Sequence, residues 1–514
     1  MGGDLVLVSA TNMSSVHCFV SNGSIWYIPS SSFINLDASE ARNDKSRKDS
    51  CFDTSSLEET SVIKNKSLLL HLNSPSLSDV ENDINEEEYE KATVNDNTSS
   101  VCATDGTQMS EIVSESTIHA LYFPDFILEM QGDIQNMFGP IKDFLAKIFP
   151  RDWLNPDDIE LESLKGGITN VLLSCANRRT KRIVLMRVYG RGTNLIIDRH
   201  REFVLHLVLT SLHLAPAIYA RFQNGLVYEY IPGRSLTPME IQRPRIYPLI
   251  AQRLGIWHNT VNCNDIDAGV EKLRQYTRSI KNNLTARTRN KFNKKSEWKK
   301  ENISNVWKLI EDWIRIVPII PELIESFENN CHGVEVNREN IRELIMKEFD
   351  FLMKITSTAE SPLVSAHCDL LSGNIILPLE AIQSDEDSPI VLPSTIENPV
   401  RFIDYEYMLA APRAFDIANH LAEWQGFDCN RLAVPEPSLS NPIFTQWIEA
   451  YLNHRATSEE ISKLTNEVAL FFGMPGFYWG IWAMIQSEIS KIDFSYAKYG
   501  RQRLQEYWDW KHNL

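Results

Sequence analysis

A short polar segment follows an apolar, strand-like run late in the chain and reads His-Cys-Asp-Leu-Leu-Ser-Gly-Asn at residues 367–374. Its Asp369 can accept the proton of an attacking hydroxyl, and its Asn374 can hold a Mg²⁺ ion against nucleotide phosphates. Phosphoryl transfer depends on positioning and charge neutralisation rather than on covalent chemistry, so one carboxylate and one amide at this spacing suit it. We interpret the segment as a candidate phosphoryl-transfer loop, although the same pattern also arises by chance.

A second acidic block begins at Asp404, thirty residues after Asn374. Asp404 ends a run of β-branched and aromatic residues at 400–403, and Glu406 follows it. Kinases carry their second metal-binding Asp at such a strand end. The order base, amide, strand, Asp is that of the kinase fold, and the pattern G-x-x-x-x-G-K-[ST] of P-loop enzymes does not occur in the chain.

Upstream patterns predict the elements that would hold a nucleotide. Residues 161–173 read as a strand, a tight turn at Gly166 and Gly167, and a second strand. Backbone N–H groups of such a turn can contact phosphate oxygens, although an ordinary Gly-Gly hairpin turn explains the pattern equally well.

Arg187 interrupts the apolar strand pattern at 182–190. A buried Arg needs an anionic partner, and a nucleotide phosphate would supply one. Glu202 lies in the helical pattern at 194–214 and could pair with Arg187, as the helix Glu pairs with the strand Lys of kinases. The alternative is that Glu202 is a solvated charge on a helix face.

A hairpin is predicted around Asn224-Gly225, and Pro232-Gly233 would end its second strand where a kinase hinge meets adenine. From residue 238 onward the pattern is mainly helical. Eleven Lys or Arg against one Glu occupy residues 272–300, which indicates a solvated helix or loop or, as a second option, contact with an anionic membrane surface.

Composition limits the class of protein. The 514 residues are 43% hydrophobic and 10% aromatic, enough for a sizeable core, and the net charge of −17 argues against a nucleic-acid binder. Eight Cys form no C-x-x-C pair and no metal-ligand spacing, which is typical of free thiols in a reducing cytosol. The start lacks the pattern of a signal peptide, so we expect a cytoplasmic protein.

Residues 468–485 carry no charge and reach the lower length limit of a membrane span. Gly473-Met-Pro-Gly interrupts them, which favours two buried helices that meet at a break over stable membrane insertion.

Three parts are expected along the chain. Residues 1–116, which are rich in Ser, Asn, Asp and Glu after an apolar start, form a largely disordered extension because they cannot bury enough apolar surface. Residues 117–233 form an N-terminal lobe with leading helices, and residues 234–514 form a helical C-terminal lobe.

The chain from about Trp153 onward resembles the choline/ethanolamine kinase family. The resemblance rests on the 367–374 segment, on Ile-Asp-Tyr-Glu-Tyr at 403–407 and on Asp-Ile-Ala-Asn-His-Leu-Ala-Glu at 416–423. The sequence Asp-Tyr-Glu-Tyr and the leucines after Asp369 are similar to the ethanolamine branch, and the long polar extension is similar to fungal members. Cys368 and Ala411 depart from the family, which usually has Asn at both positions.

The resemblance implies an α+β, eukaryotic-protein-kinase-like fold of two lobes, with an antiparallel sheet plus one helix in the N-lobe and a mainly helical C-lobe. It implies Asp369 as catalytic base, Asn374 and Asp404 as Mg²⁺ ligands, and Glu406 near a second metal. Arg187 would replace the usual Lys on the phosphates of ATP. The family's phosphate loop, hinge and bracing positions fall on Gly166, Gly167, Thr169 and Asn170, on Glu229 and Ile231, and on Asp416, Asn419 and His420.

The family's amino-alcohol pocket falls on Glu423, Trp479, Trp482 and Tyr496. Trp479 and Trp482 lie at i and i+3, so both indoles share one helix face, and indole faces attract cations within about 6 Å of the ring centre. Without the resemblance, such a pair would more often belong to a core. A primary ammonium has N–H donors that choline lacks, so Glu423 should matter more for ethanolamine.

The function expected from these features is ATP-dependent phosphorylation of ethanolamine, the first step toward phosphatidylethanolamine. The alternatives are a choline or dual-specificity kinase, an aminoglycoside-type kinase, and a catalytically inactive binding scaffold. A homodimer is compatible with the resemblance, because members of the family often dimerise.

Overall fold

The computed structural model describes residues 16–21, 24–29, 112–128, 137–151, 153, 155–164, 170–189, 198–287, 305–383, 391–490 and 493–514. The predicted phosphate-loop residues Gly166, Gly167 and Thr169 lie outside these ranges, as does most of the predicted N-terminal extension. Within that extension β1 (Val16–Ser21) pairs antiparallel with β2 (Ser24–Pro29). The main core already includes Val113, a few residues before the expected boundary at 116.

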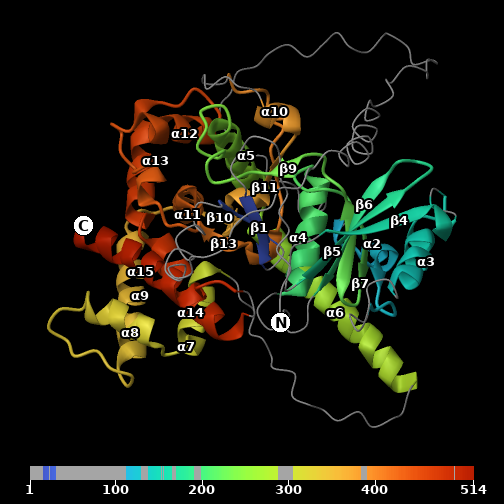
Figure 1. The fold of residues 1–514 in the computed structure, drawn as a ribbon, viewed down its shortest axis with the longest axis horizontal. Coiled ribbons are helices and arrows are strands. Elements are labelled where there is room, and N and C mark those ends of the chain that lie inside the picture. The colour runs from blue at the N-terminus through green and yellow to red at the C-terminus, as the bar shows by residue number, and fades with distance from the viewer. Residues whose placement is uncertain are drawn as a thin grey trace, which may run out of the picture. The chain divides into compact units, whose positions relative to one another are not determined.

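A six-stranded sheet forms the N-terminal lobe (Figure 1). Neighbouring strands pair antiparallel except at the β3 edge, where β3 lies parallel to β7, so the sheet is mixed rather than purely antiparallel. The strands in spatial order are β3 (Tyr122–Phe123), β7 (Ile218–Phe222), β8 (Gly225–Glu229), β6 (Ile183–Tyr189), β5 (Asn170–Asn177) and β4 (Ile159–Leu164).

Alternation along β6 decides where Arg187 points. Val184, Met186 and Val188 are buried in the cluster that also includes residues of α3 (Phe138–Ile148). Because successive side chains of a strand face opposite sides, Arg187 faces the other side, where α4 (Arg199–Ser211) lies. Asp198 caps α4, since its carboxylate accepts from the backbone N–H groups of residues 200 and 201.

The predicted β7–β8 hairpin is confirmed, but its turn is one residue earlier than the Asn-Gly signal. Phe222 pairs with Gly225, so residues 223 and 224 form the two-residue turn. A Cβ on Gly225 would lie 2.1 Å from the Phe222 ring and 2.2 Å from the Arg187 carbonyl oxygen. The glycine is therefore required for close packing rather than for an unusual backbone angle.

Two small sheets carry the loops of the C-terminal lobe. β10 (Leu363–Ala366) pairs with β13 (Leu409–Pro412), and β11 (Ile375–Leu377) pairs with β12 (Arg401–Phe402) and β9 (Arg234–Ser235). The remaining helices are α2 (Glu115–Leu121), α5 (Tyr247–Thr260), α6 (Cys263–Arg287), α7 (Val306–Ile316), α8 (Pro321–Glu328), α9 (Ile341–Ser357), α10 (Leu379–Gln383), α11 (Arg413–Ala422), α12 (Pro442–Leu452), α13 (Ser458–Phe471), α14 (Met474–Ile489) and α15 (Tyr496–His512).

The apolar stretch around residue 473 forms two helices, as predicted. Helix α13 ends at Phe471, α14 begins at Met474, and Gly473 between them packs so closely on Trp510 that a Cβ would lie 2.3 Å from its ring. Residues 458–489 are long and apolar enough to cross a membrane, but 83% of their most apolar window is buried inside the protein. They behave as core, with α14 packed along α15 (Figure 1).

The basic segment is only partly described. Its first residues lie on α6, where Arg274 forms an ion pair of 2.6 Å with Asp198, the cap of α4. At least this cation therefore has a structural role, and residues 288–300 lie outside the described ranges.

Candidate active site

Strand pairing brings the two predicted chemical loops together. β10 precedes and β11 follows the 367–374 loop, while β12 precedes and β13 follows the 403–408 loop. Ala366 pairs with Leu409, and Ile375 pairs with Phe402. Each end of one loop is therefore fixed to an end of the other, although residues 375–402 separate the loops in sequence.

Asp369 and Asn374 are bonded to each other within the first loop. The Asn374 amide nitrogen donates to the Asp369 backbone oxygen at 2.8 Å and to its Oδ2 at 3.2 Å. This orientation leaves Asn374 Oδ1 and Asp369 Oδ1 buried and without a hydrogen-bond partner in the described part of the chain. Buried polar atoms are rarely left unpaired, so these oxygens indicate a missing ligand.

Asp416 of α11 holds the backbone of this loop. Its two carboxylate oxygens accept from the N–H groups of His367 and Cys368, both at 2.8 Å, and His258 Nε2 lies 2.9 Å from Oδ2. Burial alone would raise the pKa of Asp416, but the His258 hydrogen bond and the other contacts lower it below its ordinary value. A carboxylate that stays charged can serve both N–H groups at once.

Two further α11 residues contact the same loop, as expected for bracing positions. Asn419 donates to the Cys368 carbonyl at 2.9 Å, and His420 Nδ1 lies 2.8 Å from the Leu370 carbonyl. Burial lowers the pKa of His420 to about 4, so this imidazole is neutral and can donate one N–H to that carbonyl.

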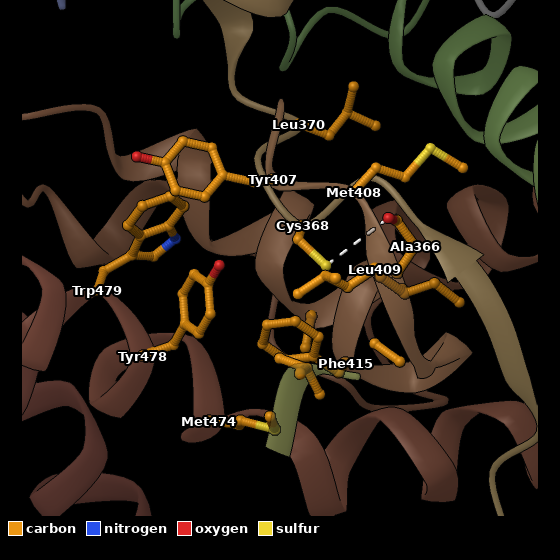
Figure 2. Close-up of a cluster of buried hydrophobic side chains, with 14 of the residues drawn as sticks. Ala366, Cys368, Leu370, Tyr407, Met408, Leu409, Phe415, Met474, Tyr478 and Trp479 are labelled. Atoms are coloured by element: carbon orange, nitrogen blue, oxygen red, sulfur yellow. Dashed lines mark hydrogen bonds between the residues drawn. The ribbon is translucent and has the colours of Figure 1, made fainter. Parts of the chain in front are cut away.

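Each of the two loops contains a residue with left-handed backbone. Cys368 has φ +61°, in the left-handed region that Asn tolerates better than most side chains. The Asn that the resemblance leads one to expect would suit this angle, whereas the buried Cys368 packs near Leu409 and Phe415 and its thiol donates to the Ala366 carbonyl at 3.7 Å (Figure 2). Asp404 is left-handed as well, at φ +64°.

A buried network of charges joins the sheet, α4 and the second loop. Arg187 lies 3.5 Å from both Glu202 and Asp404 and 3.1 Å from Glu406. Arg199 lies 2.8 Å from Glu202 and 3.3 Å from Glu406. Glu202 is therefore not a solvated helix charge, and the predicted pair with Arg187 is present.

Burial strongly affects the acids of this site. It raises the pKa of Asp369 well above its ordinary value, and Asp404, Glu423 and Glu406 add to the shift. It likewise raises the pKa of Glu406, with Asp404 adding and Arg187 and Arg199 opposing. Like charges this close favour the neutral acid unless a cation joins them.

The donor atoms fit a Mg²⁺ ion. Within the described ranges Asn374 Oδ1 and Glu406 Oε1 are buried without a hydrogen-bond partner, and Asp404 adds a second carboxylate. Mg²⁺ prefers such oxygen ligands. No three His, Cys, Asp or Glu side chains of the described residues already stand at metal-binding distance, and the Arg187 guanidinium forms ion pairs with both Asp404 and Glu406.

Aromatic side chains of α14 and α15 lie next to the 403–408 loop. The Trp479 and Trp482 rings meet edge to face at 5.3 Å, and Tyr496 lies 5.9 Å from Trp482. Trp479 Nε1 donates to Asn419 Oδ1 at 2.8 Å, and Trp482 Nε1 donates to the Tyr407 hydroxyl at 3.2 Å. Figure 2 shows Trp479 next to Tyr407, so the indoles adjoin the 403–408 loop.

Glu423 reaches the same region from the end of α11. Its carboxylate is buried, contributes to the raised pKa of Asp369, and accepts from Arg503 Nη1 at 3.2 Å. Burial raises the pKa of Glu423 itself, and Arg503 offsets part of that shift. The sequence analysis did not predict Arg503 as a partner of the Glu423 carboxylate.

Besides Arg187, the structure describes three of the residues predicted to contact ATP. Glu229 ends β8, and its exposed carboxylate accepts from the Ala217 N–H at 3.0 Å, while Ile231 follows at the start of the connection to β9. The backbone of Asn170 begins β5, directly after the turn residues that lie outside the described ranges.

Sequence reasoning missed Arg199, Arg503 and Tyr407. Arg199 sits three residues before Glu202, an i,i+3 spacing that could have suggested the pair. Arg503 has the same i,i+3 spacing to Glu506, but no local pattern indicates its contact with Glu423, which lies eighty residues away. Tyr407 belongs to the 403–407 motif, but the sequence did not predict that its hydroxyl contacts Trp482.

The chain is similar to several known proteins. The family model described as choline/ethanolamine kinase matches residues 161–508. The ethanolamine kinase of Drosophila melanogaster is 30% identical over 327 residues, which cover 63% of this chain and 53% of the relative. Ethanolamine kinase 2 of Homo sapiens is 30% identical over 357 residues, covering 68% and 76%. The structure of an ethanolamine kinase from Plasmodium vivax shares the fold, with a TM-score of 0.52 at 23% identity, covering 77% and 94%.

Proposed function

Because this chain belongs to the choline/ethanolamine kinase family, we propose that it transfers the γ-phosphoryl group of ATP to the hydroxyl of ethanolamine. The observation that carries the proposal is the pairing of the Asp369 loop with the Asp404 loop, next to the buried indoles of Trp479 and Trp482. The ethanolamine kinases among its relatives support the choice of amino alcohol.

In this mechanism Asp369 accepts the hydroxyl proton as the hydroxyl oxygen attacks the γ-phosphorus and ADP leaves with the bridging oxygen. A carboxylate with a raised pKa is a better base near neutral pH than an ordinary Asp, and burial and acidic neighbours supply that shift. The bonds from Asp416 to the loop backbone keep Asp369 in position.

Binding of ATP rests on several groups. Mg²⁺, when held by Asn374, Asp404 and Glu406, would neutralise negative charge on the phosphates. Arg187, fixed in place by Glu202, would contact the phosphates from the sheet side, and the backbones of Glu229 and Ile231 would meet adenine. The glycine turn at 166–167 with Thr169 and Asn170 would cover the phosphates.

Trp479, Trp482 and Tyr496 would hold the ammonium group by cation–π attraction, and Glu423 would supply a counter-charge. Choline is the second candidate substrate, since the same aromatic faces attract a quaternary ammonium. Ethanolamine is favoured because its N–H groups can donate to Glu423, whereas choline has none. We propose a cytoplasmic location, where ATP and the small amine are both available.

The test is kcat/KM for ethanolamine and for choline with Mg-ATP, on the full chain. We expect ethanolamine to be favoured at least tenfold, about 1.4 kcal/mol of transition-state discrimination. Asp369→Asn should lower kcat by a factor of about 10²–10⁴ while ATP affinity is retained. Asp350→Asn, an exposed Asp on α9, is the matched control.

Each outcome has a separate meaning. Comparable values for both amines would assign dual specificity, and a choline preference would reverse the substrate choice. Absence of turnover with either amine would reject the proposed activity. Normal turnover by Asp369→Asn would remove Asp369 as the base.

A further inference from the structure

Arg503 lies at the centre of a buried group of charges next to the proposed amino-alcohol pocket. It is carried by α15 and is 0% exposed. Its Nη1 lies 3.2 Å from Glu423 Oε1 and 3.2 Å from the Tyr499 hydroxyl. Its Nε lies 3.2 Å from Oε1 of Glu506, one turn later on the same helix. Two carboxylates therefore share one guanidinium.

The charge count of this group matters for a cationic substrate. Glu423 and Arg503 by themselves form a neutral pair, which leaves Glu423 little net attraction for an ammonium group. Glu506 adds a second negative charge, so that the three side chains together carry one excess negative charge. An ammonium beside Glu423 would balance it, and buried charge is costly unless it is balanced in this way.

The contact between Arg503 and Glu506 differs from a bidentate ion pair that fixes both side chains. Arg413 and Glu467 in the same lobe form a bidentate pair, with Nε and Nη2 at 3.0 and 2.7 Å from the two carboxylate oxygens. Arg503 Nε and Nη2 and Glu506 Oε1 instead make no hydrogen bond of good geometry within the described ranges. Their attraction is mainly one of charge, which acts over distance and does not fix a rotamer.

The pKa shifts of Arg503 and Glu506 also indicate that the two side chains interact. Burial opposes the charge on Arg503, and among the groups that favour it Glu506 comes first, ahead of Tyr499 and Glu423. Burial raises the pKa of Glu506, and Arg503 is the foremost group that offsets the shift. Both carboxylates, each 3.2 Å from the guanidinium, thus contribute to the balance of Arg503.

Resting on the proposed amino-alcohol kinase function, we propose that Glu506 is a positioning residue that shares the positive charge of Arg503 and so leaves net negative charge at the Glu423 carboxylate to attract the substrate ammonium. Glu506 itself does not touch the substrate. It determines how strongly the pocket prefers a cation over a neutral molecule of the same shape.

The charge of Glu506 can be removed by a substitution that keeps the volume of the side chain. It borders a cavity of about 810 Å³ whose lining also includes Gln425, Arg431 and Asp509. Arg431 is paired with Asp509 there, so Arg503 remains the nearest ion-pair partner of Glu506. Glu506→Gln keeps the side-chain volume and removes only the charge.

The experiment compares dissociation constants for cations and for their neutral isosteres on the full chain. Ethanolamine is paired with propan-1-ol, and choline with 3,3-dimethylbutan-1-ol. We expect Glu506→Gln to reduce the preference for the cation at least tenfold, through weaker cation binding alone. Glu506→Asp should retain most of the preference, and Glu449→Gln, an exposed Glu on α12, should not change it.

A preference that Glu506→Gln leaves unchanged would overturn the inference, as would equal weakening of cation and isostere, which is what a merely structural role predicts. Melting temperatures check that each variant is folded, and Glu506→Asp supplies the comparison if Glu506→Gln is not. Turnover is measured in parallel. If the wild-type chain prefers cations but phosphorylates neither amine, the proposed function fails while the binding ratio still tests Glu506. If the wild-type chain has no preference for cations, the inference itself is wrong.

Discussion

Arg187, Arg199, Glu202 and Glu406 show how single residues in this protein depend on one another. All four side chains are at most 10% exposed, and each is within ion-pair distance of at least two charged neighbours. Two cations and two anions of this network, with Asp404 nearby, balance to within one charge. Removal of one member leaves a buried charge without compensation, which costs more than the pair contributes.

Arg199→Met tests this at the residue scale. Met keeps most of the volume but leaves Glu202 and Glu406 with Arg187 alone, so we expect the free energy of unfolding to fall by about 3–5 kcal/mol. Urea denaturation followed by circular dichroism measures it. Arg315→Met is the control, because Arg315 also pairs with two acids, Glu311 and Asp312, but is 55% exposed. That change should cost at most about 1 kcal/mol. Equal losses of stability in the two variants would show that burial of the network does not increase the cost of removing a cation.

At the scale of elements, the site depends on how strands and helices are spaced. The two chemical loops are aligned by β10–β13 and β11–β12 pairing, and α11 holds one of them through Asp416. Trp257 of α5 supports the same strands, since its buried Nε1 donates to the Ser365 carbonyl at 2.8 Å. A fully buried indole removes roughly 150–250 Å² from water, about 4–6 kcal/mol at 25 cal/mol per Å².

Close packing of α5 on α12 gives a prediction at this scale. A Cβ on Gly255 would lie 2.0 Å from the backbone oxygen of Tyr451, and backbone cannot rotate away. Gly255→Ala should therefore lower the free energy of unfolding by about 1–3 kcal/mol or more. Gly139→Ala is the matched control on α3, where a Cβ would have nothing within 4 Å. Because Pro140 follows and disfavours helical backbone at a residue with a Cβ, this variant should change the free energy of unfolding by at most about 1 kcal/mol in either direction. Thermal unfolding of both variants distinguishes them, and equal losses for both would contradict the packing argument.

At the scale of the whole molecule, buried histidines link stability to pH. Burial lowers the pKa of His206, His367 and His420 to about 4 in the folded chain, against an ordinary value of 6.5. The unfolded chain therefore binds more protons between pH 6.5 and 4. The stability that each neutral imidazole contributes is fully present above pH 6.5 and is lost as the pH falls toward 4.

His206→Gln tests this linkage, because His206 lies on α4 with its Nε2 2.9 Å from the Pro216 carbonyl, a bond that Gln can replace. The variant should lose less stability than the wild-type chain between pH 6.5 and 4, by about 3 kcal/mol over the full range. Buried carboxyls with raised pKa values, such as Asp369, act in the opposite direction, so the difference between the two proteins is the quantity to measure. His454→Gln, at an exposed histidine whose pKa is raised, should leave the loss unchanged. Parallel curves for His206→Gln and the wild-type chain would disprove the linkage.

The sequence by itself determined the order of the chemical groups and most of the elements that carry them. Spacing and the family resemblance predicted Asp369, Asn374 and Asp404 as site residues, and apolar periodicity predicted β4 to β8, the helix with Glu202 and the break at Gly473. These features are local, because the pattern that specifies a strand, a cap or a turn lies within a few neighbouring residues. The turn formed by residues 223 and 224 lies one residue before the Asn-Gly signal, and Gly225 packs on the Arg187 carbonyl of the neighbouring strand, a contact that no local pattern indicates.

Only the tertiary structure decided which charges meet. Arg199 lies 207 residues from Glu406, and Arg503 lies 80 residues from Glu423. No local pattern records such pairs, because a buried cation can be balanced by any acid that the fold brings within a few ångströms. Residue types therefore predicted an acidic, aromatic site, and the fold decided that Arg187 lies among three carboxylates and that Glu423 and Glu506 share Arg503.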